Sequence, residues 1–257
     1  MIKQYLANFG LHLLLIFFIL GSGTLHAQNK LKLVTGNNYA PFTDQGLPNR
    51  GIATKIVETV FSHSNVPVEV TFLPWERGLR ETIANKYRGI FPYIKRQVWE
   101  ENFIYSDPFF SMELRIVVKK DNPKIIESFS DLKGQILCLP LGYEPDERFA
   151  EMIKQKALLV YQPSELNNCI KMLLGGRVDF MTMPDYIMNY SCVKLLEDDP
   201  EKFIKYVGPS MGNIELHFLA PKSNPASKTL IAEFNRSLEA LKLNGFLDPI
   251  IENYPAF

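Results

Sequence analysis

Residues 88–110 read RGIFPYIKRQVWEENFIYSDPFF, and our interpretation of the chain starts from this segment. Its apolar start, Ile90 and Phe91, stops at Pro92 and predicts a buried strand that ends at a turn. A charged segment with several aromatic residues follows, and residues 114–118 then predict a return strand. A strand, a polar loop and a return strand are typical of a ligand-binding loop at the edge of an α/β sheet. The same pattern also fits an ordinary surface loop, so the choice depends on the rest of the sequence.

Strand and helix patterns alternate on both sides of this segment. Before it, residues 30–35 and 66–72 predict strands, and residues 52–63 and 74–85 predict helices. After it, the expected strands are 114–119, 136–140, 158–161, 177–183, 203–207 and 214–220, and the expected helices are 146–156, 164–174 and 226–243. This alternation predicts α/β units with largely parallel sheets.

Polar breaks occur at residues 120–123 and 221–225, and the pattern forms two similar α/β blocks that are joined near residues 119 and 216. Residues 214–257 contain a strand and a long helix but no sheet of their own, so we expect them to rejoin the first block. We therefore predict a first lobe of residues 28–117 and 216–257 and a second lobe of residues 118–215.

The first 27 residues have the features of a secretory signal peptide. Lys3 is their only charged residue, residues 13–20 are all apolar, and Ala27 is a small residue at the expected cleavage site. The apolar run is too short to span a bilayer, although an uncleaved membrane anchor is the alternative interpretation. We therefore expect an exported, periplasmic protein.

Length and charge limit the classes of function. The chain has 257 residues, and removal of the 27-residue signal peptide leaves 230, which is enough for one large or two modest domains. Lys3 is the only charge lost from 28 basic and 28 acidic residues, so the mature chain has a net charge of −1. Because a nucleic-acid-binding protein would need a basic surplus, nucleic acid is not expected as a partner.

Three cysteines, all in the second half, leave an odd thiol in an oxidising compartment. Cys138 lies in the apolar run 136–139 and is expected to be a core residue. Cys169 and Cys192 are therefore the candidate disulfide pair. The spacings of the three cysteines, with no neighbouring histidine, do not indicate a metal site.

The loop after the first predicted strand places two aromatic residues where α/β folds bind ligands. Tyr39 and Phe42 lie just past the carboxyl end of that strand and are therefore candidates for a ligand site. Trp75 begins the helix over residues 74–85.

The charged residues of that helix have competing interpretations. Arg77, close to Trp75, suits a stacking or charge-pairing role, with a solvated helix face as the alternative. Glu76 and Arg80 are four residues apart in the favourable order, so we expect a surface ion pair between them.

Common catalytic and nucleotide-binding motifs are missing from the sequence. It contains no G-x-S-x-G, no Walker A, no G-x-G-x-x-G and no H-E-x-x-H motif. Neither a cofactor nor a metal is therefore expected, and an enzymatic activity has no support in the motifs.

Several short motifs recur in a characteristic order along the mature chain. They are YAPF at 39–42, Gly51 before the first helix, PWER at 74–77, IFPY at 90–93, YSDPF at 105–109, DLKG at 131–134 and GRVD at 176–179. Together with the signal peptide, this series resembles the extracytoplasmic solute-binding proteins of ABC importers, family 3, the polar amino acid type. The resemblance covers essentially all of the mature chain.

The resemblance implies an α/β, two-lobed periplasmic-binding-protein-like fold (type II) that closes on its ligand by a hinge movement. The two hinge strands joining the lobes would be residues 114–119 and 214–220. Ligand-binding residues are expected on both lobes: Tyr39, Phe42, Trp75, Arg77, Tyr93, Arg96, Trp99, Gly142, Tyr143 and Asp185.

The chain departs from the family pattern where the ligand carboxylate is usually bound. Family members that bind α-amino acids carry Thr-x-x-Arg before the motif at 105–109, and the Arg clasps the carboxylate. Here the Thr falls on Arg96 and the Arg falls on Trp99, while the usual carboxylate of the second lobe falls on Pro184, next to Asp185. Either Arg96 and Asp185 take over from displaced positions, or the ligand is not a standard amino acid. We expect the second.

The resemblance implies a monomeric periplasmic protein that captures a small polar solute, an amino acid or a related compound, and performs no chemistry on it. It would deliver the solute to an ABC transporter permease in the inner membrane. One alternative is a stand-alone ligand sensor of the same fold. Another is an enzyme on this fold, such as a periplasmic dehydratase acting on a cyclohexadienyl amino acid.

Overall fold

The computed structural model describes residues 30–141, 143 and 145–254. Two interpretations from the sequence lie outside this part of the chain: the signal peptide at residues 1–27 and the binding role of Gly142. Among the described residues, no helix combines the length and the apolar character that crossing a membrane requires.

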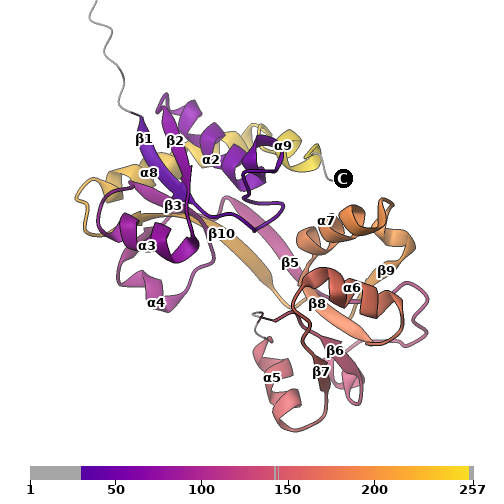
Figure 1. The fold of residues 1–257 in the computed structure, drawn as a ribbon. Helices are drawn as coiled ribbons and strands as arrows, with labels where there is room; N and C mark the ends of the chain where they lie inside the picture. The colour runs from indigo at the N-terminus through magenta and orange to yellow at the C-terminus, as the bar shows by residue number, and fades with distance from the viewer. Residues whose placement is uncertain (1–29, 142, 144, 255–257) are drawn as a thin grey trace, which may run out of the picture. The chain divides into compact units, whose positions relative to one another are not determined.

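In the described part of the chain, ten strands form one mixed sheet with the order β2-β1-β3-β10-β5-β8-β6-β7, in which β4 also pairs with β10 and β9 with β5. Figure 1 shows their arrangement. The strands are β1 (Leu31–Thr35), β2 (Val68–Phe72), β3 (Gly89–Tyr93), β4 (Phe103–Tyr105), β5 (Phe110–Lys119), β6 (Ile136–Cys138), β7 (Leu159–Tyr161), β8 (Phe180–Pro184), β9 (Ile204–Val207) and β10 (Asn213–Pro221).

Two parallel groups of strands are joined by two long antiparallel strands. β1 pairs in parallel with β2 and β3, and β6 pairs in parallel with β7 and β8. β5 pairs with β10 over its first residues and with β8 and β9 over residues 114–119. β10 pairs with β5 over residues 213–216 and with β3 and β4 over residues 217–221. Each of these two strands therefore runs from one parallel group to the other.

The predicted hinge strands, residues 114–119 and 214–220, lie inside β5 and β10. The expected two-lobed α/β architecture is therefore confirmed, although the sheet is less uniformly parallel than predicted. Contacts between residues group the chain from Leu31 onward into one compact unit. The lobe boundaries expected at residues 117/118 and 215/216 stay a prediction.

Helices cover the strands as the alternation of the sequence predicts. They are α2 (Ile52–His63), α3 (Trp75–Ile83), α4 (Gln97–Glu100), α5 (Glu147–Lys154), α6 (Leu166–Leu174), α7 (Asp185–Leu196), α8 (Ser227–Leu243) and α9 (Asp248–Glu252). Short 3₁₀ turns occur at Pro48–Arg50, Phe129–Leu132 and Pro200–Lys202.

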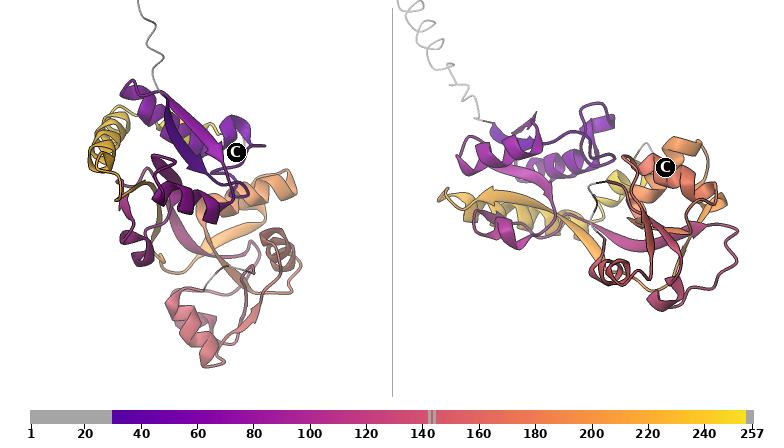
Figure 2. Two further views of the ribbon diagram at one scale, coloured as in Figure 1. Left: turned by 60° about the vertical axis from the view of Figure 1, so that its left-hand side comes forward. Right: turned by 60° about the horizontal axis from the view of Figure 1, so that its bottom comes forward.

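The alternation of side chains along each strand divides the core between two faces. On β1 and β3, Leu33 and Phe91 pack in the same cluster as the buried residues of α2 and α8. Val34 and Ile90, the next residues along, pack with Trp75 and Leu79 of α3. Helices α2 and α8 therefore lie on one face of this group of strands and α3 on the other, as the two further views show (Figure 2).

Two local predictions are wrong. The strand expected to stop at Pro92 continues through it, because β3 extends to Tyr93. The helix α7 was not predicted from the sequence at all. Its buried residues Ile187, Met188, Tyr190 and Cys192 spread over more than half of the helix circumference, so no single apolar stripe shows the helical period in the sequence.

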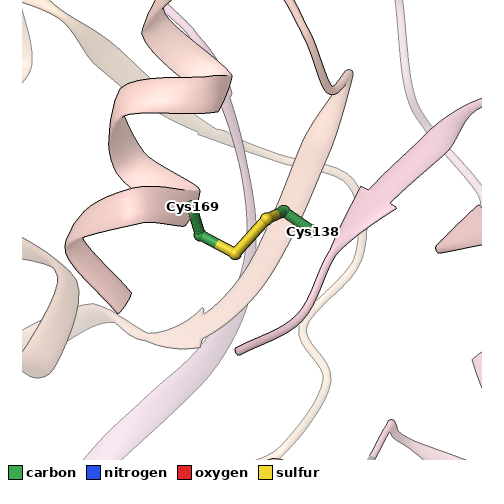
Figure 3. The surroundings of a disulfide bond; sticks show 2 residues. All are labelled: Cys138 and Cys169. Carbon is green, nitrogen blue, oxygen red and sulfur yellow. A yellow bond between two sulfur atoms is a disulfide. The ribbon is translucent and has the colours of Figure 1, made fainter. Parts of the chain in front are cut away.

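The disulfide bond joins Cys138 to Cys169, not Cys169 to Cys192 (Figure 3). Cys138 ends β6 and Cys169 lies on α6, which packs against β6, and their Cα atoms are 5.6 Å apart. Cys138 is buried, as the apolar run predicts. Cys169 is buried as well, so the burial of Cys138 did not exclude it from a disulfide. Cys192 lies on α7 as a buried free thiol.

Candidate functional site

A cavity of about 540 Å³ lies where β1 and β3 end and α3 begins. Because β1 and β3 are parallel neighbours, their carboxyl ends bring the loops after Thr35 and after Tyr93 together. The cavity is lined by Asn38, Tyr39, Trp75, Glu76, Leu79, Pro92, Tyr93, Ile94, Arg96, Trp99 and Leu216. The lining is thus built from the loop after β1, the start of α3, the end of β3 with the segment that follows it into α4, and one residue of the joining strand β10.

Four aromatic rings form a continuous series along the cavity, which we call the aromatic wall: Tyr39, Trp75, Tyr93 and Trp99. The ring centroids of neighbours are 6.3 Å, 5.6 Å and 4.9 Å apart in this order, and each contact is edge to face. This is the arrangement that aromatic rings prefer, since the positive edge of one ring meets the negative face of the next. The two tryptophans of the chain both belong to this wall.

Trp75 is held in place by two contacts with the loop after β1. Its Nε1 donates a hydrogen bond to the carbonyl oxygen of Asn37, at 3.1 Å. Its ring lies against Gly36 so closely that a Cβ atom at Gly36 would be 2.1 Å from Cε2 of the indole. The polar group of Trp75 is therefore satisfied, and only a residue without a side chain fits beneath its ring.

Tyr93 contributes the one buried hydroxyl of the aromatic wall that lacks a hydrogen-bond partner among the described residues. The residue is 6% exposed. Burial, with Tyr105 as a smaller cause, raises the pKa of Tyr93 well above its ordinary value, so the hydroxyl is neutral. An unpaired buried hydroxyl is costly, and a polar group of a ligand would remove that cost.

Two side chains of opposite charge line the cavity. Arg96 lies just before α4 with its guanidinium carbon 5.6 Å from the centroid of the Trp99 ring, a cation–π contact. The hydroxyl of Tyr105 is 3.4 Å from both the backbone nitrogen and the backbone oxygen of Arg96. Glu76 lies in the first turn of α3 and is exposed.

The expected ion pair between Glu76 and Arg80 does not form. Arg77 instead donates from Nε to Glu81, at 2.8 Å, and Lys86 lies 2.8 Å from the other oxygen of Glu81. The pairing is thus shifted by one residue along α3, which is about 100° around the helix. Arg77 is held outside the cavity lining, while Glu76 belongs to it.

The structure brings together five of the ten residues predicted to bind ligand: Tyr39, Trp75, Tyr93, Arg96 and Trp99. Phe42 lies outside the lining. It is 0% exposed and packs against the rings of Phe110 and Tyr186, with centroid distances of 5.1 Å and 5.8 Å. Its aromatic ring therefore serves the core.

Two candidates of the second lobe, Tyr143 and Asp185, also lie outside the cavity lining. Asp185 begins α7, and its Oδ1 accepts hydrogen bonds from the backbone N–H groups of Glu113, at 3.2 Å, and Tyr186, at 2.7 Å. This carboxylate ties β5 to the start of α7. Tyr143 is 42% exposed and is the second, smaller cause, after burial, of the raised pKa of Tyr39.

Six lining residues are not among the ten named as ligand-binding: Asn38, Glu76, Leu79, Pro92, Ile94 and Leu216. Asn38, Glu76 and Ile94 are each next to a predicted residue. The segments that hold them were therefore recognised, but their own contribution to the cavity lining was not. Leu216 comes from β10, more than a hundred residues away, and no local pattern links it to this site. No group of His, Cys, Asp and Glu among the described residues could hold a metal ion.

Comparisons with known proteins agree with this geometry. A sequence model of the bacterial extracellular solute-binding proteins, family 3, matches residues 31–256. No curated protein matches the chain. The fold is similar to that of solved structures that share less than a quarter of its sequence, three of which illustrate the range.

The GlnP substrate binding domain 2 from Lactococcus lactis, in an open conformation, has a TM-score of 0.72 at 18% identity, covering 89% of this chain and 96% of its own. The second substrate binding domain assigned to an amino acid ABC transporter of Streptococcus pneumoniae has a TM-score of 0.71 at 20% identity, covering 88% and 99%. An ancestral arginine-binding protein bound to arginine has a TM-score of 0.61 at 23% identity, covering 90% and 100%.

Proposed function

The chain belongs to the bacterial extracellular solute-binding proteins, family 3, and from this we propose that it captures a small polar solute for an ABC importer. The solute, an amino acid or a related compound, binds at the cavity bounded by the aromatic wall. The protein binds it without chemical change and delivers it to a permease in the inner membrane.

The observation that carries this proposal is the position of the cavity. It lies at the carboxyl ends of two parallel strands, where α/β proteins bind ligands, and it reaches Leu216 on β10. β10 is one of the two strands that run between the parallel groups. A solute in this cavity therefore touches a strand that hinge closure would move.

Closure would be the event that the transporter recognises. Bending of the two joining strands, β5 and β10, would bring the second lobe over the aromatic wall. Tyr143 and Asp185 remain our candidates for its contribution to the ligand contacts. A ligand favours the closed state only to the extent that it binds that state more tightly, so contacts from both lobes are required.

The cellular setting follows from the same family. We infer that residues 1–27 direct export and are removed, and that the mature protein acts in the periplasm as a monomer. The related domains of Lactococcus lactis and Streptococcus pneumoniae are named as substrate-binding domains, which supports a transport role rather than catalysis.

Two measurements on the protein purified from the periplasm of the producing cells test the proposal. Native mass spectrometry should show a bound small molecule. A thermal-shift panel of amino acids, polyamines and sugars should then show a stabilisation that grows with ligand concentration. At a hundredfold excess over Kd, binding adds about 2.7 kcal/mol, which raises Tm by roughly 5–10 °C in a chain of this size.

The transport role needs a separate readout. Deleting the gene should abolish uptake of the bound compound by intact cells, and expression of the protein should restore it. Uptake that does not change on deletion would contradict the importer role. Conversion of a panel compound into a new product would contradict binding without chemistry.

A further inference from the structure

We propose that the solute is an organic cation that needs no carboxylate for binding, with an ammonium or guanidinium group held against the aromatic wall and neutralised by Glu76. The inference rests on the proposed function and specifies its ligand. Three features of the cavity support it, and each concerns a different group of atoms.

The aromatic wall is suited to a positive charge. Cations are attracted to the faces of aromatic rings within about 6 Å, most strongly to tryptophan. The N–H of Trp75 is occupied by Asn37, so what this side chain offers to a ligand is its π system. The wall already holds one guanidinium, because that of Arg96 lies over Trp99.

Glu76 supplies the opposite charge. It is the only carboxylate among the described residues that line the cavity, and it has no ion pair with any other described residue. The nearby cations Arg77 and Lys86 are both paired with Glu81 instead. The carboxylate of Glu76, in the first turn of α3, is therefore available to a cation in the cavity.

A site for a carboxylate is not built in this cavity. Binding a carboxylate tightly calls for a guanidinium fixed in a two-pronged geometry. Arg96 is the only cation in the described lining, and it is an exposed side chain with no hydrogen bond or ion pair to another described side chain. At the position where the family resemblance predicts the clasping Arg, the chain has Trp99.

Tyr93 is expected to discriminate between organic cations with and without N–H groups. Its buried hydroxyl has free lone pairs and no partner among the described residues, so it can accept a hydrogen bond from an N–H group of the ligand. A primary amine or a guanidinium satisfies this hydroxyl, whereas a quaternary ammonium cannot. The cavity is therefore expected to prefer cations that carry N–H groups.

The test uses intrinsic fluorescence, because the two tryptophans of the chain are both in the aromatic wall. Titrations of the full chain with agmatine, putrescine and tetramethylammonium supply cations without a carboxylate. Arginine, glutamine and glucose supply a cationic amino acid, a neutral amino acid and a sugar. We expect saturable changes with agmatine or putrescine, and at least tenfold weaker binding of tetramethylammonium.

Two substitutions that remove charges of opposite sign from the cavity then separate the possibilities. Glu76→Gln should weaken agmatine binding by at least tenfold. Arg96→Gln should strengthen it about two- to threefold, because a like charge is removed from the cavity. Tyr93→Phe should reduce the preference for agmatine over tetramethylammonium. Glu69→Gln removes an exposed carboxylate from β2, outside the lining, and is the matched control that should leave binding unchanged.

The outcomes distinguish this inference from the proposed function. If arginine or glutamine binds and Arg96→Gln abolishes the binding, Arg96 clasps a carboxylate, and the inference is overturned while solute capture stands. The inference would also be overturned if glucose binds with the same affinity to the wild type and to Glu76→Gln. If no compound of the panel binds and native mass spectrometry finds no captured molecule, the proposed function itself fails.

Discussion

Gly36 is the smallest residue of the candidate site and controls the position of its largest one. Trp75 packs on the backbone of Gly36 at a distance that leaves no room for a Cβ atom. We predict that Gly36→Ala moves the indole away and breaks its hydrogen bond to Asn37. Overpacking of this kind costs about 1–3 kcal/mol, and ligand affinity should fall together with stability.

Tryptophan emission reports this change directly, since displacement of Trp75 toward water shifts its emission to longer wavelength. Gly46→Ala is the control, because Gly46 lies in the loop before α2, outside the cavity lining, and has no aromatic neighbour at its Cβ position. Unchanged emission and affinity in Gly36→Ala would show that the loop after β1 adapts without moving the wall.

Cys192 gives a prediction for the pH dependence of stability. Burial raises the pKa of this thiol from 9.0 to about 11. The folded state therefore keeps the proton where the unfolded state loses it, so the stability contributed by the neutral thiol is complete below pH 9 and declines as the pH rises through 11. The free energy of unfolding, measured by urea denaturation, should fall more between pH 8 and pH 10.5 in the wild type than in Cys192→Ala. Equal falls would contradict a buried neutral thiol.

For single residues, the sequence predicted which side chains line the cavity better than it predicted what those side chains contact. Aromatic residues placed just after strands identified Tyr39, Trp75 and Tyr93, because chain position alone brings such residues to one sheet edge. The roles of Gly36 and Glu76 depend on contacts that form only after folding. Sequence spacing also misassigned the ion pairs of α3, where rotation by one residue decides which carboxylate faces the cavity.

Among the elements, the disulfide between β6 and α6 should stabilise the second parallel group. It joins residues 31 apart, and closing a loop of that length in the unfolded chain is worth about 3–4 kcal/mol. The double substitution Cys138→Ala, Cys169→Ala should lower the free energy of unfolding by about that amount. Cys192→Ala, which removes a buried cysteine but no disulfide, is the matched control and should cost less.

Reduction offers a second readout for the same prediction. A thiol reductant should lower the midpoint of unfolding of the wild type and leave that of the double variant in place. A wild type that is insensitive to reductant would contradict the disulfide. Labelling of one thiol in the unfolded, unreduced wild type, against three after reduction, would identify Cys192 as the free cysteine.

Elements with strong periodicity were predicted and the others were not. The helix over residues 52–63 has one apolar face and was predicted with its observed bounds. The helix α7 buries residues on several sides, so its sequence shows no stripe. The short helix α4 has only four residues and so shows no period. The strand β4 is held by its pairing with β10, and β3 continues through Pro92 to pair with β10 at Tyr93. The antiparallel pairing of β5 and β10 could not be predicted either, because the local sequence of a strand does not show which strands it pairs with.

For the whole molecule, the two joining strands set the kind of motion that is available. β5 and β10 pair with each other near the point where each changes its partners, at residues 110–113 and 213–216. Bending there would require changes in few backbone dihedral angles, while the pairing inside each parallel group is kept. We therefore predict a rigid-body hinge rather than a local rearrangement of the cavity.

A hinge closure has a consequence that scattering can measure. With a saturating amount of the compound that binds in the titrations, the radius of gyration should fall toward about 17 Å, the value for a compact chain of some 230 residues. The same compound should leave the scattering of Glu76→Gln unchanged at a concentration that this variant does not bind. A saturated wild type whose radius of gyration stays constant would contradict closure. Recognition by the permease would then have to depend on the aromatic wall and its occupant rather than on a change of shape.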